Sequence, residues 1–346
     1  MSTTLLFSPT PYYMAIKNDN ENKTEEDARR LDQALRPLSF DEYVGQEMIK
    51  NNLHILLRAA KERGTSPEHV LFYGPPGLGK TTLAHLVSKE LGANLRISSG
   101  PTIMKVGDLA GILTNLTPGD VLFIDEIHRL NKMIEEVLYP AMESGKLDIV
   151  IGKGPSARTI QLDLPPFTLI GATTRISLLS SPLRSRFSGG VYRLQYYSES
   201  EISEIVMRSS LLLKAEITAE ASFEIAKRAR FTPRIANYYL KRARDFAQVH
   251  KAIIDKDVVG RALDLLEIDN LGLGVPEKMV MDSLVKTFGG GPVGLSTIAA
   301  AIGEEEATVE DVIEPYLMQI GLIERTPRGR KATEKGLLLF KDDTKA

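Results

Sequence analysis

The sequence of 346 residues contains no cysteine and no tryptophan. Without cysteine, neither a disulfide framework nor a thiolate metal site can form. No stretch approaches about 18 consecutive apolar residues, so we expect no segment that crosses a membrane. The apolar cluster at residues 5–7 is too short for a secretory signal peptide. These absences favour a globular protein of the reducing cytoplasm.

An excess of one charge is also lacking, since 43 Lys and Arg face 45 Asp and Glu, for a formal net charge of -2. This balance excludes a uniformly basic nucleic-acid coat protein, so any contact with nucleic acid must use a local basic patch. The chain is 43% hydrophobic and 25% charged, as expected of a globular protein with a real core. Its length predicts two or three domains.

The beginning of the chain is polar and charged, and we expect residues 1–34 to be a disordered tail. Short apolar strands are then predicted at 69–73, 121–124 and 167–171, with helical or mixed segments between them. Each strand ends in polar residues. This pattern predicts a parallel α/β sheet, in which ligands bind at the carboxyl ends of the strands.

A glycine-rich stretch follows the first strand. Residues 74–81 read Gly-Pro-Pro-Gly-Leu-Gly-Lys-Thr and satisfy G-x-x-x-x-G-K-[ST], with a predicted helix at 81–91 behind them. The glycines let backbone N–H groups wrap phosphates at a helix N-terminus. Lys80 is expected to reach the β- and γ-phosphates of ATP, and Thr81 to hold Mg2+. A glycine turn without chemical meaning is the alternative, and the strand–helix context disfavours it.

Polar side chains end the second and third strands. Asp125 is expected to hold magnesium through water, and Glu126 to polarise the attacking water. Two adjacent carboxylates favour nucleotide hydrolysis over simple binding, although on their own they are commonly just solvated acids. Thr173 and Thr174 end the third strand. A hydroxyl there could orient the water or sense the γ-phosphate, and a purely structural role is an equal alternative.

Arginines follow the sheet. Arg184 and Arg186 lie in Ser-Pro-Leu-Arg-Ser-Arg-Phe. A guanidinium supplied to the γ-phosphate of a neighbouring subunit acts as an arginine finger and raises the rate about 10³- to 10⁵-fold. A surface salt bridge is the ordinary alternative. Arg234 opens a later helix and could reach the same phosphates from the other side.

The rest of the chain divides into a hairpin, a helical region and a C-terminal unit. Alternating apolar residues around a Gly-Pro turn predict a projecting β-hairpin at 148–162. Helical spacing predicts a small all-α domain, with helices at 199–213, 218–230, 234–250 and 255–265. Three more helices are predicted at 277–288, 295–302 and 308–319, the last with Thr308 as its N-cap. A hairpin after them completes a winged helix.

The predicted wing is locally basic. Residues 321–335 contain five basic and two acidic side chains, and the basic ones include Arg325, Arg328 and Arg330. Such a cluster is usually a solvated loop. At the tip of a wing, contact with DNA phosphates is the better interpretation, and binding would be independent of sequence and sensitive to salt.

Together these motifs resemble the AAA+ ATPases and, within them, the RuvB family. The resemblance covers about residues 35–335 and rests on the stretches at 35–37, 73–84, 122–130, 151–155, 171–175, 232–237, 288–294 and 325–330. The last four are far more diagnostic than the phosphate loop, which many ATPases share.

The resemblance implies an α/β fold: an AAA+ P-loop ATPase with a parallel sheet at 35–197, a small all-α lid domain at 198–273, and a C-terminal winged helix at 274–346. It implies that Thr174 is the first sensor, Arg186 the finger and Arg234 the second sensor. The residues that it places around nucleotide, besides Arg186 and Arg234, are Leu35, Arg36, Gly77, Gly79, Lys80, Thr81, Thr82 and Tyr197.

The implied function is that of a hexameric DNA motor. ATP hydrolysis would drive branch migration of Holliday junctions in recombination and repair. The hairpin at 148–162 would dock the RuvA partner, and the RuvC resolvase would act with the complex. Arg325, Arg328 and Arg330 would contact double-stranded DNA.

The chain departs from the family pattern at several positions. Residues 188–190 read Ser-Gly-Gly, with one extra residue, so either Tyr196 or Tyr197 could line the nucleotide pocket. Phe231 stands where the family usually has glycine. Residues 274–277 read Gly-Val-Pro-Glu in place of a more charged segment.

Other functions are less well supported. Protein-remodelling AAA+ enzymes grip polypeptide with an aromatic pore-loop residue, and residues 97–120 contain no aromatic side chain. A DNA-bound switch of the initiator or clamp-loader type could use the wing equally well, but the hairpin favours a dedicated protein partner. A DNA-binding module without enzymatic activity would not need Lys80, Asp125 and Glu126 together.

Overall fold

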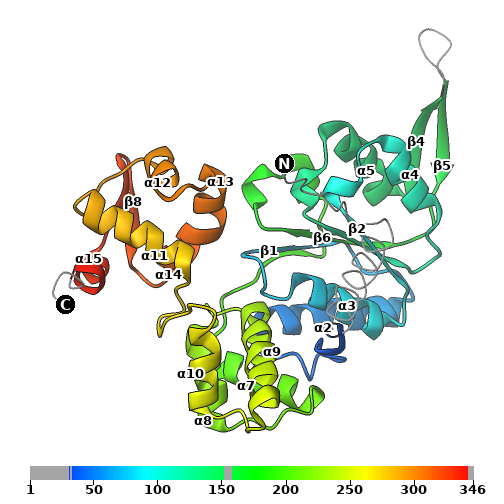
Figure 1. Ribbon diagram of the computed structural model, residues 1–346. Coiled ribbons are helices and arrows are strands. Elements are labelled where there is room, and N and C mark those ends of the chain that lie inside the picture. Colours follow the sequence, from blue (N-terminus) through cyan, green and yellow to red (C-terminus); the bar gives the residue numbers. More distant parts are fainter. Residues whose placement is uncertain (1–30, 32, 152–157, 342–346) are drawn as a thin grey trace, which may run out of the picture. The chain divides into compact units, whose positions relative to one another are not determined.

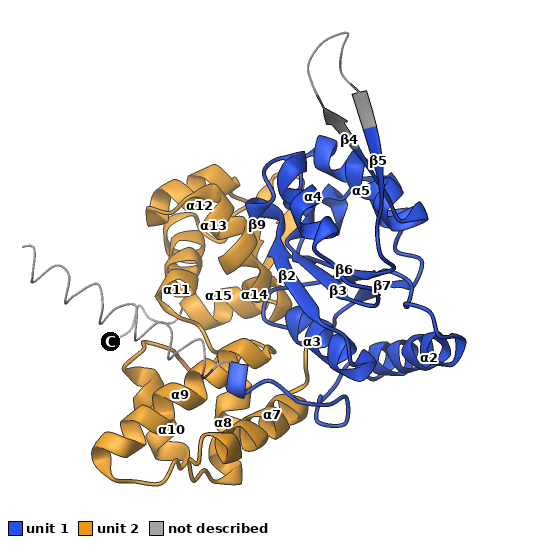
Figure 2. Cartoon of the chain, turned by 90° about the vertical axis from the view of Figure 1, so that its right-hand side faces the viewer, with its two compact units in different colours: residues 1–195 blue, residues 196–346 orange. Residues whose placement is uncertain are grey.

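The chain folds into two compact units, residues 1–195 and 196–346, in a computed structural model that describes residue 31 and residues 33–151 and 158–341 (Figures 1 and 2). Nearly all of the predicted tail lies outside the described residues, as does the tip of the predicted hairpin. Within the described part, no helix combines the length and the apolar character needed to cross a bilayer.

Unit 1 is built on a five-stranded sheet whose neighbouring strands all run parallel, in the order β2-β3-β6-β1-β7. The strands are β1 (Val70–Tyr73), β2 (Leu95–Ser99), β3 (Val121–Asp125), β6 (Thr168–Thr173) and β7 (Gly190–Arg193). The three predicted strands correspond to β1, β3 and β6, which lie at the centre. The predicted parallel sheet is therefore confirmed, and its two outer strands were not foreseen.

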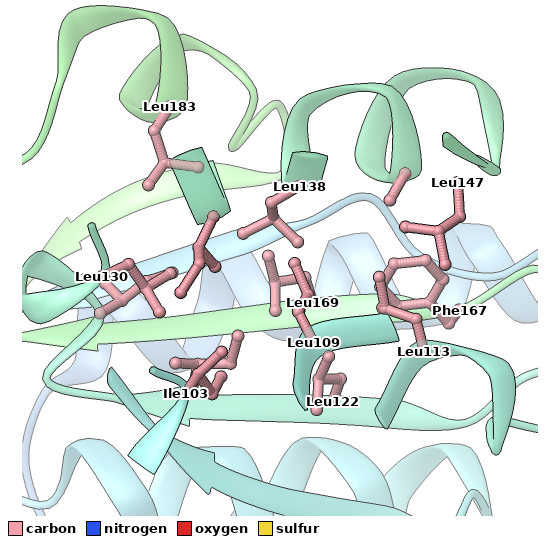
Figure 3. Close-up of a cluster of buried hydrophobic side chains, with 14 of the residues drawn as sticks. Ile103, Leu109, Leu113, Leu122, Leu130, Leu138, Leu147, Phe167, Leu169 and Leu183 are labelled. Carbon is pink, nitrogen blue, oxygen red and sulfur yellow. The ribbon is translucent and has the colours of Figure 1, made fainter. Parts of the chain in front are cut away.

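Helices cover both faces of this sheet (Figure 1). They are α2 (Glu47–Arg63), α3 (Lys80–Leu91), α4 (Val106–Thr114), α5 (Lys132–Ser144) and the short α6 (Ser181–Ser185). On one face, Leu122 and Leu169 of the sheet pack with Leu109 of α4 and Leu138 of α5, all fully buried (Figure 3). Each such side chain contributes about 1.5–3 kcal/mol on burial. This packing fixes the edge at which β1, β3 and β6 end.

The predicted hairpin is also present. Strands β4 (Lys146–Ile151) and β5 (Arg158–Asp163) pair antiparallel as a separate two-stranded sheet that extends away from the main one (Figure 1). Its base is anchored by fully buried Leu147 and by a hydrogen bond from the Leu164 N–H to the Gly145 carbonyl.

Unit 2 begins with four helices, as the sequence predicts. They are α7 (Glu199–Leu212), α8 (Ala219–Arg228), α9 (Pro233–His250) and α10 (Lys256–Asp264). A capping box starts α7, because Ser198 accepts from the Glu201 N–H while Glu201 accepts from the Ser198 N–H. The loops at one end are tied by a parallel bridge between Ile217 and Ile254.

The second half of unit 2 is a winged helix. It comprises α11 (Val275–Asp282), α12 (Leu295–Ile302), α13 (Glu306–Thr308), α14 (Glu314–Gln319), the wing strands β8 (Ile323–Thr326) and β9 (Gly329–Ala332), and α15 (Glu334–Lys341). Wider π-type turns extend α11 through residue 287 and join α13 to α14. The predicted start of the third helix is wrong, since Thr308 lies inside the helix, two residues after it begins. Helix α15 was not foreseen.

Candidate nucleotide site and wing

The phosphate loop runs from the end of β1 to the start of α3. Gly74, Gly77 and Gly79 all have positive φ, at 137°, 80° and 100°. A Cβ at Gly74 would lie 2.9 Å from the Leu194 carbonyl oxygen, and one at Gly79 would lie 2.7 Å from the Tyr43 hydroxyl. The loop therefore needs glycine both for its backbone angles and for its close packing.

Lys80 lies inside this loop. Its side chain is buried, and its ammonium donates to the carbonyls of Gly74, at 2.7 Å, and Pro75, at 2.9 Å. Thr81 and Thr82 follow in the first turn of α3 and are half-buried. A helix N-terminus beneath an enclosed ammonium is the arrangement that attracts phosphate groups.

The two predicted catalytic carboxylates lie at the end of β3. An Asp125 oxygen accepts from the Glu126 N–H at 2.9 Å. Glu126 has φ 47° and ψ 44°, the left-handed region, which costs a residue other than glycine about 1 kcal/mol or more. Because β6 lies between β3 and β1, these carboxylates are separated from the phosphate loop by one strand.

The Glu126 carboxylate is held by the predicted sensor and by a histidine. Thr174 donates to Glu126 Oε2 at 3.2 Å. His128 Nδ1 lies 3.1 Å from the same oxygen and 2.9 Å from the Thr173 hydroxyl. The Thr173 carbonyl in turn accepts from the Gly74 N–H at 3.2 Å. A continuous set of contacts therefore joins the Glu126 carboxylate to the start of the phosphate loop.

His128 was missed by sequence reasoning, although it lies only two residues after Glu126. Burial lowers its pKa, and Arg175 and Arg129 act in the same direction, while Glu126 raises it. A neutral ring with its proton on Nδ1 donates to the carboxylate without neutralising it. The signal available in the sequence was its place just behind the carboxylate pair.

The residues before the sheet reach back to α3. Arg36 donates to Nε2 of His85, whose pKa is lowered by burial and by the charge of Arg36, so the ring accepts this bond in its neutral form. Leu35 is buried, and the Tyr43 hydroxyl donates to the Leu78 carbonyl at 3.4 Å. Arg36 is thus held against α3, the helix that follows the phosphate loop, and Tyr43 contacts the loop itself at Leu78.

The predicted finger lies against helix α5 of its own chain. Arg186 pairs with Glu143 at 3.0 Å, donates to the Pro182 carbonyl at 2.7 Å, and lies 4.4 Å from the centre of the Tyr139 ring. Arg184, by contrast, is exposed.

The remaining nucleotide candidates belong to unit 2. Arg234 is exposed in the first turn of α9. The Tyr197 N–H donates to the Phe231 carbonyl at 3.1 Å, and the Tyr196 ring packs on Phe231 with centroids 6.2 Å apart. Both tyrosines therefore contact the loop that leads into the Arg234 helix.

In the wing, the three predicted DNA contacts differ. Arg325 and Arg330 are directly opposite each other on β8 and β9, and both donate to the buried carboxylate of Glu314, at distances from 2.6 to 3.2 Å. Both also lie within 3.5 Å of Glu310. Arg328 is exposed at the turn between the strands. Two of the three arginines thus hold the wing on its own helix.

Comparison with known protein families gives three adjoining matches. Residues 35–194 match the Holliday junction DNA helicase RuvB P-loop domain, residues 197–269 the RuvB AAA lid domain, and residues 270–341 the RuvB C-terminal winged helix domain.

Solved structures give the same result. The Thermotoga maritima RuvB Holliday junction branch migration motor is 48% identical, with a TM-score of 0.80 over 89% of this chain and 98% of that one. Two mutant forms of the Thermotoga maritima protein are 49% identical over the same shares, with TM-scores of 0.80 and 0.81.

Proposed function

This chain belongs to the RuvB family, and from that premise we propose how its residues perform the work of an ATP-dependent Holliday junction branch-migration motor. The family and the intact phosphate loop make it a nucleotide-binding ATPase that acts on DNA junctions. A clamp-loader type of switch, the alternative considered from the sequence, has no such support.

We assign nucleotide binding and hydrolysis to the site in unit 1. Lys80 and the N–H groups of the loop would hold the phosphates, with Leu35, Arg36, Gly77, Gly79 and Thr82 around the nucleotide. Thr81 and Asp125 would hold Mg2+, which would neutralise phosphate charge. No described group of three or more His, Cys, Asp or Glu residues offers a metal site of its own, so the ion would depend on the phosphates for its other ligands.

Glu126 would polarise the attacking water. The observation that carries this assignment is the contact of Thr174 and His128 with one Glu126 oxygen. Thr174 has a single hydroxyl proton, so it can donate either to Glu126 or to a γ-phosphate. When it turns to the phosphate, Glu126 loses one partner and its oxygen becomes available to water. This competition would make hydrolysis depend on a properly seated γ-phosphate.

Assembly extends the proposal. We propose a homo-hexamer in which Arg186 leaves Glu143 and acts as the finger of the neighbouring site. Arg234 would act as second sensor, beside Tyr197. The hairpin 148–162 would dock RuvA, with RuvC joining the complex in the cytoplasm. Residues 35–197, 198–273 and 274–346 would be the ATPase, lid and winged-helix domains.

A synthetic Holliday junction with fluorescent arms tests the proposal. ATP and RuvA should allow the wild-type protein to separate the arms, while Lys80→Ala and Glu126→Gln should abolish separation. Lys89→Ala, which changes an exposed lysine of the same helix α3, is the matched control and should act as wild type. Arm separation by Lys80→Ala, or none by wild type despite ATP hydrolysis, would contradict the proposal.

A further inference from the structure

The loop between α8 and α9 has an unusual backbone. Arg230 and Phe231 both adopt the left-handed region, at φ 52° and 57°. Neither residue is glycine, and two such residues in succession are strained unless their neighbours hold them in place. The contacts of their side chains therefore indicate what this loop is built to hold.

Arg230 binds the winged helix through its whole guanidinium fork. Nη1 and Nη2 donate to the two carboxylate oxygens of Glu277 on α11, at 2.7 and 3.0 Å, and Nε donates to the Gly272 carbonyl at 2.9 Å. Glu277 is only 3% exposed. A bidentate pair fixes orientation as well as distance, so it restrains rotation of one element against the other.

Aromatic rings complete the contact. Arg230 lies 5.1 Å from the centre of the Tyr316 ring of α14, and the Phe231 ring lies 6.3 Å from it. The Tyr316 hydroxyl donates to the Leu271 carbonyl at 2.5 Å. A cluster formed by Arg230, Phe231 and Tyr316 therefore joins the lid, the connecting segment and the winged helix.

The connecting segment is itself folded tightly. One Asp269 oxygen accepts from the N–H groups of Leu271 and Leu273, at 2.9 and 2.8 Å. A Cβ at Gly272 would lie 2.5 Å from the Arg228 carbonyl oxygen, so the segment packs directly on the end of α8. Residues 269–274 thus lack the features of a flexible hinge.

The position of this cluster along the chain connects it with nucleotide sensing. Phe231 accepts from the Tyr197 N–H and comes three residues before Arg234. The sequence departs from the family pattern at Phe231 and in the segment 274–277, which contains Glu277. Arg230 links the two positions, because it precedes Phe231 in the chain and binds the Glu277 carboxylate.

We propose that Arg230 is a positioning residue that locks the winged helix onto the lid, so that movement of α9 on nucleotide binding is passed to the wing as a rigid-body motion. The lock itself is inferred only from the contacts of Arg230 with Glu277, Gly272 and Tyr316. Its role in the motor rests on the proposed function of Arg234.

A distance measurement tests the lock independently of motor activity. Because the chain has no cysteine, Val249→Cys on α9 and Val312→Cys on the winged helix, both exposed, give the only two spin-label sites. Labelled subunits diluted with unlabelled ones should give one narrow distance distribution, unchanged between ADP and a non-hydrolysable ATP analogue. Arg230→Ala should broaden it. A parent distribution that is broad or shifts with nucleotide would overturn the lock, as would a narrow one in Arg230→Ala.

Coupling is tested by junction separation per ATP hydrolysed. Arg230→Ala should keep its ATPase rate within about twofold and lose about fivefold to tenfold in separation per ATP. The control is Arg242→Ala, which removes an exposed pair with Asp245 within the lid and should not change that ratio. If Arg230→Ala leaves junction separation per ATP unchanged, or if the control loses as much, Arg230 does not couple ATP hydrolysis to movement of the wing.

Conservative variants separate the lock from simple loss of folding. Glu277→Gln keeps the shape of the side chain, and Arg230→Lys keeps the charge but cannot form the fork. If both variants unfold with wild-type midpoints, they should still show a broadened spin-label distance distribution and less junction separation per ATP hydrolysed. Wild-type values in both variants would contradict the proposal. If wild type itself fails to separate junctions while the label distance stays narrow, the proposed function fails and the lock does not.

Discussion

At the scale of single residues, the surroundings of His69 predict how the stability of the fold depends on pH. It lies just before β1, where Nδ1 accepts from the Leu169 N–H at 2.9 Å and Nε2 lies 3.0 Å from the Met142 carbonyl. These partners require a neutral ring with its proton on Nε2. Burial lowers the pKa of His69 below its ordinary value of about 6.5, more than the Met142 bond and Glu68 raise it.

The sign of the effect follows from this lowered pKa. Below about pH 6.5 the unfolded chain binds a proton that the folded chain resists, so the free energy of unfolding should fall as pH falls. Urea unfolding at about pH 7.5 and about pH 5.5 should show this loss. His69→Gln, which donates and accepts without titrating, should reduce the slope. The exposed His54→Gln is the control. An equal slope in His69→Gln would rule out His69 as the source.

The proposed catalytic motifs can be predicted from the sequence because their chemistry depends on fixed local spacing. Lys80, Asp125 and Glu126 are recognisable for that reason. The role of His128 depends on which hydroxyl of β6 is placed beside it, and this is set by strand order. The ion pairs of the wing could not be predicted for a similar reason, since the basic window at 321–335 leaves out Glu314, which Arg325 and Arg330 bind.

At the scale of elements, the wing gives a prediction that separates DNA contact from stability. Arg328→Ala should weaken DNA binding and reduce the slope of log affinity against log salt by about one, with no loss of stability. Arg330→Ala should instead destabilise the winged helix by about 2 kcal/mol, because Glu314 is buried and loses a partner. Salt-dependent anisotropy and thermal unfolding measure the two effects.

Lys341→Ala, at the end of α15, is the control for simple loss of a positive charge from this domain. If Arg328→Ala leaves the salt slope at its wild-type value, Arg328 does not contact DNA. If Arg330→Ala unfolds at the wild-type temperature, the Glu314 pair is not structural.

The central strands could be predicted from the sequence, but the outer ones could not. β1, β3 and β6 are buried by helices on both faces and therefore read as continuous apolar runs. β2 includes exposed Arg96, and β7 includes exposed Arg193, because each lies at an edge of the sheet. Edge strands owe their conformation to pairing with a neighbour, which their own composition does not reveal.

At the scale of the whole molecule, the proposed role of Arg186 as an arginine finger predicts complementation between subunits. Glu126→Gln and Arg186→Ala should each lower the ATPase rate, the latter by about 10³-fold or more. In a ring with randomly mixed subunits, about a quarter of the interfaces join an intact Glu126 to an intact Arg186. An equal mixture should therefore recover part of the activity that both pure variants lack.

Subunit exchange must be shown for this mixture, by energy transfer between labelled subunits. No recovery despite exchange would place Arg186 in the site of its own chain or in a structural role with Glu143. Arg184→Ala, which removes the exposed neighbouring arginine, is the matched control and should hydrolyse ATP as wild type does.

The acidic helix that binds the wing arginines also affects how the winged helix can recognise DNA. Between Lys286 and Arg325 the chain has no Lys or Arg, while the third helix carries Glu306, Glu310 and Asp311 beside Glu314. A winged helix normally reads base edges with this helix, and phosphate would repel this one. The domain therefore does not recognise a particular DNA sequence. A motor that moves along DNA of any sequence benefits from this, because no high-affinity site in the genome can make it pause.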